Sequence, residues 1–239
     1  MKLPMKDFSL QIHSIYLATE GEGIFIGSPQ VFIRLQGCNI GCLNCDSKET
    51  WSFEKGSFLN FPEVLKKIKK ESQEKVKRLS ITGGDPLHPR HANALKNFVA
   101  MAKKEYWINI EASGSRVDDS LFDQINFISF DFKTPSTGVN TSYANILKLA
   151  KQYPGKFQIK SVVSDEKDFF SSYETLKRLR KEDVDQTFSW CLTPCFESRE
   201  SFPAERIKKI IDLNYQFGGP FRVIVQQHKV LFGSEFANI

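Results

Sequence analysis

The feature that most constrains the fold is a regular alternation of short β-rich runs with longer helical patterns. Apolar residues recur at helical spacing over residues 61–72, 91–105, 142–152, 169–182 and 203–215. Strand patterns occupy residues 31–36, 79–82, 107–111, 127–132, 157–163, 187–192 and 221–226. Alternation of this kind forms βαβ units around a parallel sheet. About six parallel strands are too few for a closed eight-stranded barrel, so the pattern predicts an open, partial (β/α) barrel with helices outside.

The composition is that of a soluble globular protein, with 41% hydrophobic and 26% charged residues. There is no internal repeat, low-complexity tract or linker, so we expect one domain over residues 1–239. The net charge of +5 is small and its basic residues are scattered, which argues against a nucleic-acid partner. The densest basic run, at residues 66–70, fits a solvated helix face better than a phosphate-binding patch.

The chain carries no sign of a membrane or secretory destination. No apolar run approaches the roughly 18 residues that a membrane-spanning helix needs. Residues 1–14 mix charged, polar and apolar side chains and lack the apolar core of a signal peptide. We therefore expect a cytoplasmic protein without a membrane partner.

Three of the five cysteines lie within eight residues of one another, as Cys38, Cys42 and Cys45. An odd and low cysteine count argues against a disulfide framework and favours metal chemistry in a reducing compartment. The C-x3-C-x2-C spacing can ligate three irons of a [4Fe-4S] cluster and leave the fourth iron open to a substrate or cofactor. Gly37 and Gly41 suit a loop that folds tightly around such a cluster.

Two other interpretations of the cysteine loop stay open at this point. One is a zinc site completed by Cys191 or Cys195, and the other is three incidental buried thiols. Cys191 and Cys195 are too few for a second cluster, so we expect them to be small buried residues outside the cluster.

Polar or glycine residues follow five of the predicted strands. They are Cys38, the turn Gly83-Gly84-Asp85, residues 111–114, the pair Asp131 and Lys133, and the run Thr193-Pro194-Cys195. In parallel α/β folds the chemistry takes place at the carboxyl ends of the strands. The positions of these residues therefore predict a single site at that end of the sheet.

The cysteine loop and the glycine-glycine-acid turn together resemble the radical S-adenosylmethionine (SAM) superfamily. Gly83-Gly84-Asp85-Pro86 matches its Gly-Gly-Glu motif, although these residues alone would indicate only a turn. The resemblance implies that SAM binds the open iron and that the reduced cluster cleaves it to a 5′-deoxyadenosyl radical. The cofactor contacts that it implies are Asn44, Asp46, Gly83, Gly84, Asp85, Ser113, Gly114, Asp131, Lys133, Thr193 and Pro194. Asn44 stands where the superfamily has an aromatic residue, and Asp85 stands where it has Glu.

Five segments narrow the resemblance to the 7-carboxy-7-deazaguanine synthases of queuosine and deazapurine biosynthesis. They are residues 19–23 (TEGEG), 31–39 (VFIRLQGCN), 45–47 (CDS), 111–115 (EASGS) and 221–233 (FRVIVQQHKVLFG). The family contracts the ring of 6-carboxy-5,6,7,8-tetrahydropterin to 7-carboxy-7-deazaguanine with loss of ammonia. The resemblance also implies Mg²⁺ bound by Ser47, a flavodoxin- or ferredoxin-type electron donor, and a homodimer.

The substrate-binding residues expected for such an enzyme are Thr19, Glu20, Gly21, Glu22, Arg34, Ala112 and His228. Arg34 can bind a carboxylate through two parallel hydrogen bonds, although an arginine that covers a sheet edge would look the same in sequence. Glu20 can accept hydrogen bonds from the ring nitrogen and amino group of a pterin, but it replaces the family's Gln. Ala112 replaces a Thr, and His228 fits a pocket role or a structural one.

Two other functions are compatible with parts of the chain. A glycyl-radical activating enzyme shares the cysteine loop and a similar length, but it would lack the segment at residues 19–23. A non-catalytic protein that binds zinc or nucleic acid would hold zinc and leave SAM uncleaved.

Overall fold

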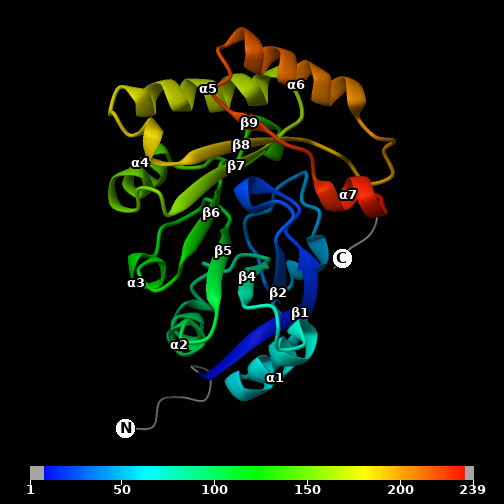
Figure 1. Ribbon diagram of the computed structural model, residues 1–239, viewed down its shortest axis with the longest axis vertical. Coiled ribbons are helices and arrows are strands. Elements are labelled where there is room, and N and C mark those ends of the chain that lie inside the picture. Colours follow the sequence, from blue (N-terminus) through cyan, green and yellow to red (C-terminus); the bar gives the residue numbers. More distant parts are fainter. Residues whose placement is uncertain (1–7, 235–239) are drawn as a thin grey trace.

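The computed structural model describes residues 8–234, which form one nine-stranded sheet with helices packed outside it (Figure 1). The strands are β1 (Ser9–Thr19), β2 (Pro29–Leu35), β3 (Ser57–Asn60), β4 (Arg78–Gly83), β5 (Trp107–Ala112), β6 (Phe127–Asp131), β7 (Phe157–Val163), β8 (Ser189–Pro194) and β9 (Arg222–Val223). Their order in the sheet is β3-β1-β2-β4-β5-β6-β7-β8-β9.

The centre of the sheet is parallel, as the alternation of strands and helices predicts. Strands β2, β4, β5, β6, β7 and β8 pair in parallel, and the two-residue β9 extends them at one edge. At the other edge β1 and β3 pair antiparallel. Because β3 and β9 are the two ends of this order, the sheet is open, and the prediction of an open partial barrel is confirmed.

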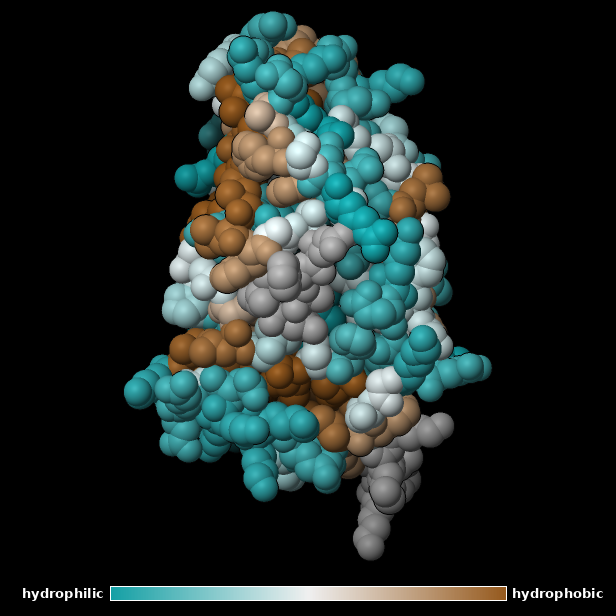
Figure 2. Space-filling view, turned by 90° about the vertical axis from the view of Figure 1, so that its right-hand side faces the viewer, coloured by the Kyte–Doolittle hydropathy of each residue, from teal (hydrophilic) through white to brown (hydrophobic). Residues whose placement is uncertain are grey.

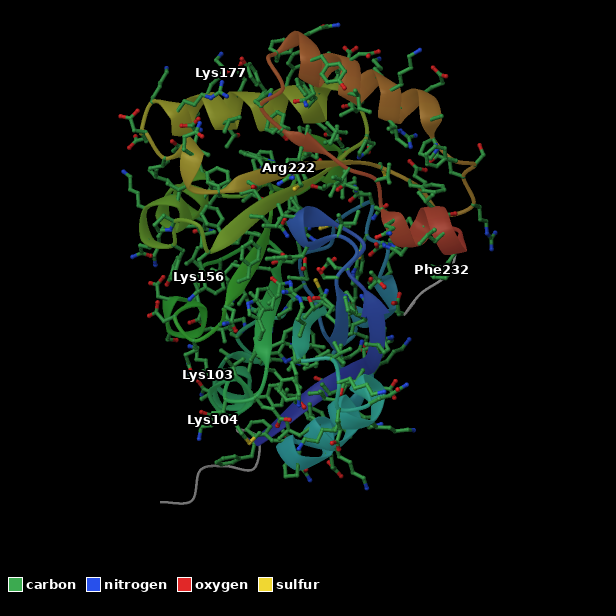
Figure 3. The ribbon with its side chains drawn as sticks, in the orientation of Figure 1. Lys103, Lys104, Lys156, Lys177, Arg222 and Phe232 are labelled. Carbon is green, nitrogen blue, oxygen red and sulfur yellow. The ribbon has the colours of Figure 1, made fainter. Side chains whose placement is uncertain are left out.

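The longer helices occur where the apolar spacing predicts them. They are α1 (Phe61–Ser72), α2 (Ala92–Ala102), α4 (Tyr143–Gln152), α5 (Glu166–Arg180) and α6 (Ala204–Gln216), with the shorter α3 (Asp119–Phe122) and α7 (Gln227–Phe232). In Figure 1, α5 and α6 lie together on the outer side of β7 and β8. The exposed lysines Lys103, Lys104 and Lys177 also point outward (Figure 3). No helix among residues 8–234 is long and apolar enough to cross a membrane.

Helix α1 shows how local sequence sets these bounds. The side chain of Asn60 accepts a hydrogen bond from the Glu63 amide at 3.0 Å, and Glu63 accepts one from the Asn60 amide at 2.8 Å. This reciprocal pair fixes the helix start. The basic run at residues 66–70 lies on α1, where its four lysines are exposed and Ile68 is buried, as expected for a solvated helix face.

The predicted strand over residues 221–226 is wrong for most of its length. Only Arg222 and Val223 pair in the sheet, and residues 227–232 form α7, so His228 lies on a helix rather than at a strand end. At this edge the chain pairs with β8 alone, and the Gln227 amide instead bonds to the Gly21 carbonyl at 3.0 Å. The predicted strand at 187–192 begins two residues later, because a 3-10 turn, η5 (Asp185–Thr187), precedes it.

A row of hydrogen-bonded polar side chains crosses β4 to β7. Asn109 donates to Ser80 at 3.1 Å, Ser129 to Asn109 at 3.2 Å, and Gln158 to Ser129 at 2.8 Å. Gln158 in turn accepts a hydrogen bond from the Ile24 amide at 2.8 Å. This last bond fastens the turn η2 (Gly23–Phe25) against the polar face of the sheet.

The turn η2 also closes one end of the barrel. The ring of Phe25 packs edge-on against Trp107 and Phe127, with centroids 5.3 and 4.8 Å apart, at the first residues of β5 and β6. Arg78, the first residue of β4, lies over both Phe25 and Trp107. The amino-terminal ends of these strands are therefore filled by side chains, and the cysteine loop and the glycine-glycine-acid turn follow the opposite ends of β2 and β4.

Candidate active site

The cysteine loop is closed by hydrogen bonds between its two ends. The Gly37 amide donates to the Thr50 carbonyl at 2.6 Å, and the Cys38 amide donates to the Trp51 carbonyl at 3.1 Å. Gly37 and Gly41 have φ angles of 110° and 76°, which favour glycine. Residues 37–51 therefore form a compact loop that returns to the carboxyl end of β2.

The three thiols of this loop are half-buried, and backbone or ring N–H groups point at two of them. The Ile40 amide donates to Cys38 Sγ at 3.4 Å, and the Ser47 amide donates to Cys45 Sγ at 3.4 Å. The indole of Trp51 adds a second donor to Cys45 Sγ at 3.3 Å. Amide donors around thiolates are the surroundings that iron–sulfur clusters have in proteins, so the three cysteines fit a [4Fe-4S] cluster.

The other two cysteines have surroundings of their own. Cys191 is fully buried on β8, where its thiol lies 3.9 Å from the Gln158 side-chain oxygen. Cys195 is also buried, and burial raises the pKa of both thiols. Within residues 8–234, no three His, Cys, Asp or Glu side chains are placed around a single metal ion. Cys191 and Cys195 are buried as we expected, and their place outside the cluster stays a prediction.

The glycine-glycine-acid turn packs directly against the cysteine loop. The Gly84 amide donates to the Leu35 carbonyl at 3.2 Å, and the Asp85 amide donates to the Gly37 carbonyl at 3.0 Å. A Cβ on Gly84 would overlap the Gly37 carbonyl, so this approach requires glycine. The ends of β2 and β4 are joined here as predicted.

The Asp85 carboxylate is fully buried and only half paired. Its Oδ1 accepts hydrogen bonds from Ser113 Oγ at 3.0 Å and from the Leu87 amide at 3.2 Å. Its Oδ2 has no partner among the described residues. A buried carboxylate oxygen without a donor is a suitable acceptor for an ammonium group, which SAM carries.

Asp131 and Lys133 extend this region to the end of β6. Their side chains form an ion pair with Nζ 2.7 Å from Oδ2, and Gly114 packs against the Asp131 carbonyl so closely that no Cβ would fit. Burial raises the pKa of the Cys42 thiol, and the ammonium of Lys133 partly offsets that rise. Thr193 Oγ1 on β8 is buried without a partner in the described part of the chain. Four of the five predicted strand ends are thus linked by close contacts, from β2 to β6.

The segment at residues 19–23 holds two glutamates in different electrostatic states. Gln30 Nε2 donates to Glu20 Oε2 at 2.6 Å, and the Glu22 amide donates to Glu20 Oε1 at 3.2 Å. Burial and the nearby Glu111 raise the pKa of Glu20 to about 7. Burial also acts to raise the pKa of Glu22, but Lys160 and His228 lower it to about 2.

Lys160 on β7 is the centre of this cluster of charged side chains, and the sequence pattern did not reveal it. Its Nζ lies 2.5 Å from Glu111 Oε2 and 3.2 Å from Glu22 Oε2. Gln226 Nε2 donates to Glu22 Oε1 at 2.6 Å and also went unidentified. Burial would lower the pKa of Lys160, but the surrounding carboxylates hold it well above its usual range. The available signal was a single charge inside the apolar strand pattern at residues 157–163.

Arg34 on β2 reaches the residue that follows Cys45-Asp46. Its Nη1 donates to Ser47 Oγ at 2.9 Å and its Nη2 donates to the Tyr16 hydroxyl at 2.9 Å. Ser47 Oγ in turn donates to Asp46 Oδ1 at 2.9 Å. A guanidinium, a hydroxyl and a carboxylate therefore lie in one hydrogen-bonded row beside the cysteine loop.

The remaining predicted residues lie in contrasting places. The ring of His228 covers Gly21, where a Cβ would overlap Nδ1, and burial lowers the pKa of this histidine. Thr19 and Asn44 are exposed. Ala112 is buried in the hydrophobic core with Ile110, so a substrate contact from its side chain stays a prediction.

Comparisons with known proteins identify similar sequences and similar folds. Residues 19–127 match the family model described as a 4Fe-4S single cluster domain. A 7-carboxy-7-deazaguanine synthase from Thermoplasma acidophilum is 30% identical over 226 residues, covering 93% of this chain and 97% of the relative. QueE from Escherichia coli superposes with a TM-score of 0.69 at 22% identity, covering 92% of this chain and 95% of QueE. Streptococcus suis SuiB bound to SAM superposes with a TM-score of 0.54 at 15% identity, covering 85% of this chain and 52% of SuiB.

Proposed function

The chain belongs to the 7-carboxy-7-deazaguanine synthase family, and from this premise we propose how its residues serve the family's reaction. That reaction converts 6-carboxy-5,6,7,8-tetrahydropterin to 7-carboxy-7-deazaguanine with release of ammonia, and the chain is accordingly a radical SAM lyase. The comparisons give no support to a glycyl-radical activating enzyme or to a zinc or nucleic-acid-binding protein.

Cys38, Cys42 and Cys45 would hold the [4Fe-4S] cluster, with SAM on its open iron. When bound, these two groups would supply the hydrogen-abstracting radical chemistry of the family's reaction. The unpaired Oδ2 of Asp85 would accept a hydrogen bond from the methionyl ammonium group of SAM. The further SAM contacts that we propose are Asn44, Asp46, Gly83, Gly84, Ser113, Gly114, Asp131, Lys133, Thr193 and Pro194.

The contact between Arg34 and Ser47 is the observation that carries the proposed function, because it provides a site for a carboxylated substrate. A substrate carboxylate placed beside the 2.9 Å bond from Arg34 Nη1 to Ser47 Oγ would meet a fixed cation and a hydroxyl. We infer that Mg²⁺ binds there, with oxygen ligands from Ser47 and the substrate carboxylate, because Mg²⁺ prefers oxygen and keeps several waters. Tyr16 keeps the other end of the guanidinium in place.

The cluster of charged side chains around Lys160 would bind the pterin ring. Glu20 replaces the family's Gln, but with a pKa near 7 its carboxyl group is protonated in a substantial fraction of molecules at neutral pH. A protonated carboxyl group has an acceptor oxygen and one O–H donor, so Glu20 can supply the acceptor and one of the two donors of the amide that it replaces. Glu22, held ionised by Lys160, offers an acceptor to the N–H groups of the pterin. His228 would contact the substrate from α7, where its ring lies against Gly21.

One experiment tests the reaction directly. The protein is reconstituted anaerobically with iron and sulfide and incubated with SAM, a reductant and 6-carboxy-5,6,7,8-tetrahydropterin. We expect 7-carboxy-7-deazaguanine by mass spectrometry, and a Cys42→Ala protein, without a complete cluster, should form none. Cleavage of SAM without the deazaguanine would reject the synthase but retain the radical SAM assignment.

A second experiment addresses the metal ion. In a Ser47→Ala protein we expect a higher Mg²⁺ concentration for half-maximal activity, because one oxygen ligand is lost. Ser52→Ala, a hydroxyl loss directly after the same loop, is the matched control. An unchanged Mg²⁺ dependence in Ser47→Ala would remove the metal from this position.

The chain's remaining partners follow from its surface. We propose a homodimer, because α7 exposes Val230, Leu231 and Phe232 on a face that carries further hydrophobic side chains (Figures 2 and 3). We propose that a flavodoxin- or ferredoxin-type protein docks at the cysteine loop, where Leu43 is 71% exposed. We also propose that the enzyme works in the cytoplasm, because three cysteines that hold a cluster suit a reducing compartment. Sedimentation as a monomer at micromolar concentration would contradict the dimer.

A further inference from the structure

Cys45 is the cysteine of the loop with the richest hydrogen bonding. Its sulfur accepts from the Ser47 amide at 3.4 Å and from the indole Nε1 of Trp51 at 3.3 Å. Cys38 accepts a bond from the Ile40 amide at 3.4 Å. Among residues 8–234, Trp51 is the one side chain that donates a hydrogen bond to a cysteine of this loop.

The backbone around Trp51 fixes the direction of this donor. Trp51 ends the 3-10 turn η3 (Lys48–Thr50), and its own amide bonds to the Lys48 carbonyl at 3.2 Å. Its carbonyl oxygen accepts a hydrogen bond from the Cys38 amide at 3.1 Å. Trp51 therefore contacts the first cysteine through its backbone and the third through its ring, and it is only half-exposed.

We propose that the indole N–H of Trp51 sets the reduction potential of the [4Fe-4S] cluster through its hydrogen bond to Cys45. The inference rests on the cluster of the proposed function. A donor aimed at a ligating sulfur stabilises the more negative, reduced cluster more than the oxidised one, and thus raises the potential. A higher potential makes the cluster easier for its electron donor to reduce.

The size of the effect can be stated as a ratio. At a fixed solution potential, loss of the N–H is expected to lower the ratio of reduced to oxidised cluster about tenfold, which is about 59 mV for a one-electron couple. The indole ring itself contributes packing, so the test must separate the N–H from the ring.

The test is an anaerobic redox titration of the reconstituted protein, followed by the EPR signal of the reduced cluster. Trp51 is replaced by β-(3-benzothienyl)alanine, in which sulfur takes the place of the indole N–H and the ring shape is kept. Trp51→Phe is measured beside it, and Trp107→Phe, at the start of β5 and remote from the loop, is the control. Iron and sulfide content is determined for every protein.

We expect the benzothienyl and Phe proteins to hold a full cluster and to titrate at a lower potential, and Trp107→Phe to titrate as the wild type does. A benzothienyl protein with a full cluster and the wild-type potential would overturn the proposal. If Trp51→Phe then lost its cluster, the ring would be a structural element of the loop. The titration needs no pterin, so absence of deazaguanine product would reject the proposed function without touching this result.

Discussion

Replacement of Glu20 by Gln is expected to make the stability of this protein depend differently on pH. Glu20 is 7% exposed, accepts hydrogen bonds from Gln30 and the Glu22 amide, and lies near the carboxylate of Glu111. Burial and the neighbouring carboxylate both disfavour its ionised form. The folded chain therefore keeps a proton on Glu20 that the unfolded chain releases.

The magnitude follows from the two pKa values. The pKa of the Glu20 carboxyl group is raised from 4.5 to about 7, so between these pH values the folded state binds more protons than the unfolded state. The stability that Glu20 contributes is thus fully present below pH 4.5 and is lost as the pH rises through 7. Each pKa unit corresponds to about 1.4 kcal/mol, so the whole change amounts to about 3 kcal/mol.

A second buried group acts in the opposite direction in the wild type. Burial lowers the pKa of His91 from 6.5 to about 4, so between pH 4 and 6.5 the unfolded state binds the additional proton. Stability linked to His91 therefore rises with pH where that linked to Glu20 falls. The wild-type curve alone would conceal both effects, whereas the difference between the wild type and Glu20→Gln isolates Glu20.

The assay is urea unfolding of the reduced apoprotein at intervals between pH 4.5 and 8. We expect the stability of Glu20→Gln relative to the wild type to increase by about 3 kcal/mol across this range. Glu54→Gln, at an exposed glutamate, is the control. If the Glu20→Gln difference varied by less than about 0.5 kcal/mol, within the extrapolation error, the reasoning about Glu20 would be refuted.

Three further substitutions test other parts of the site. Gly84→Ala should cost about 1–3 kcal/mol in urea unfolding and lower the bound iron, because its Cβ would overlap the Gly37 carbonyl; full iron content would contradict that contact. Lys160→Met leaves two buried carboxylates without their cation and should destabilise the apoprotein by about 3–5 kcal/mol, whereas a loss below 1 kcal/mol would argue against the ion pairs. Arg34→Lys should raise KM for the carboxylated pterin about tenfold with kcat little changed. Equal decreases in kcat and kcat/KM, with KM unchanged, would show that Arg34 does not bind the carboxylate in the ground state.

The sequence predicted that the cysteine loop and the glycine-glycine-acid turn come together, because this arrangement depends on local spacing and on parallel topology. Cys38, Gly84 and Asp85 each follow a strand directly, and neighbouring parallel strands bring their carboxyl ends together. The bonds between Gly37 and Asp85 and between Ser113 and Asp85 follow from that arrangement.

The charged cluster around Lys160 was harder to predict, because it depends on the face of the sheet toward which each strand side chain points. Lys160 and Glu111 meet across β7 and β5, and a strand buried on both sides carries no alternating pattern to indicate its inner face. The antiparallel strands β1 and β3 were missed altogether, since neither belongs to a βαβ unit. The single domain over residues 1–239 stays a prediction, and its ends lie outside the described residues 8–234.

The contacts of the turn η2 and its neighbours determine the order in which parts of this enzyme can form during its synthesis. The bond from Ile24 to Gln158 joins residues 134 positions apart, the pair of Glu22 and Lys160 spans 138, and Gln226 reaches Glu22 across 204. Bonds at the neck of the cysteine loop join near neighbours instead. Chain segments emerge from the ribosome in sequence, and contacts of long range form last. A nascent chain that ends before β7 therefore already carries Cys38, Cys42 and Cys45, while Glu22 lacks its cation until Lys160 has been synthesised.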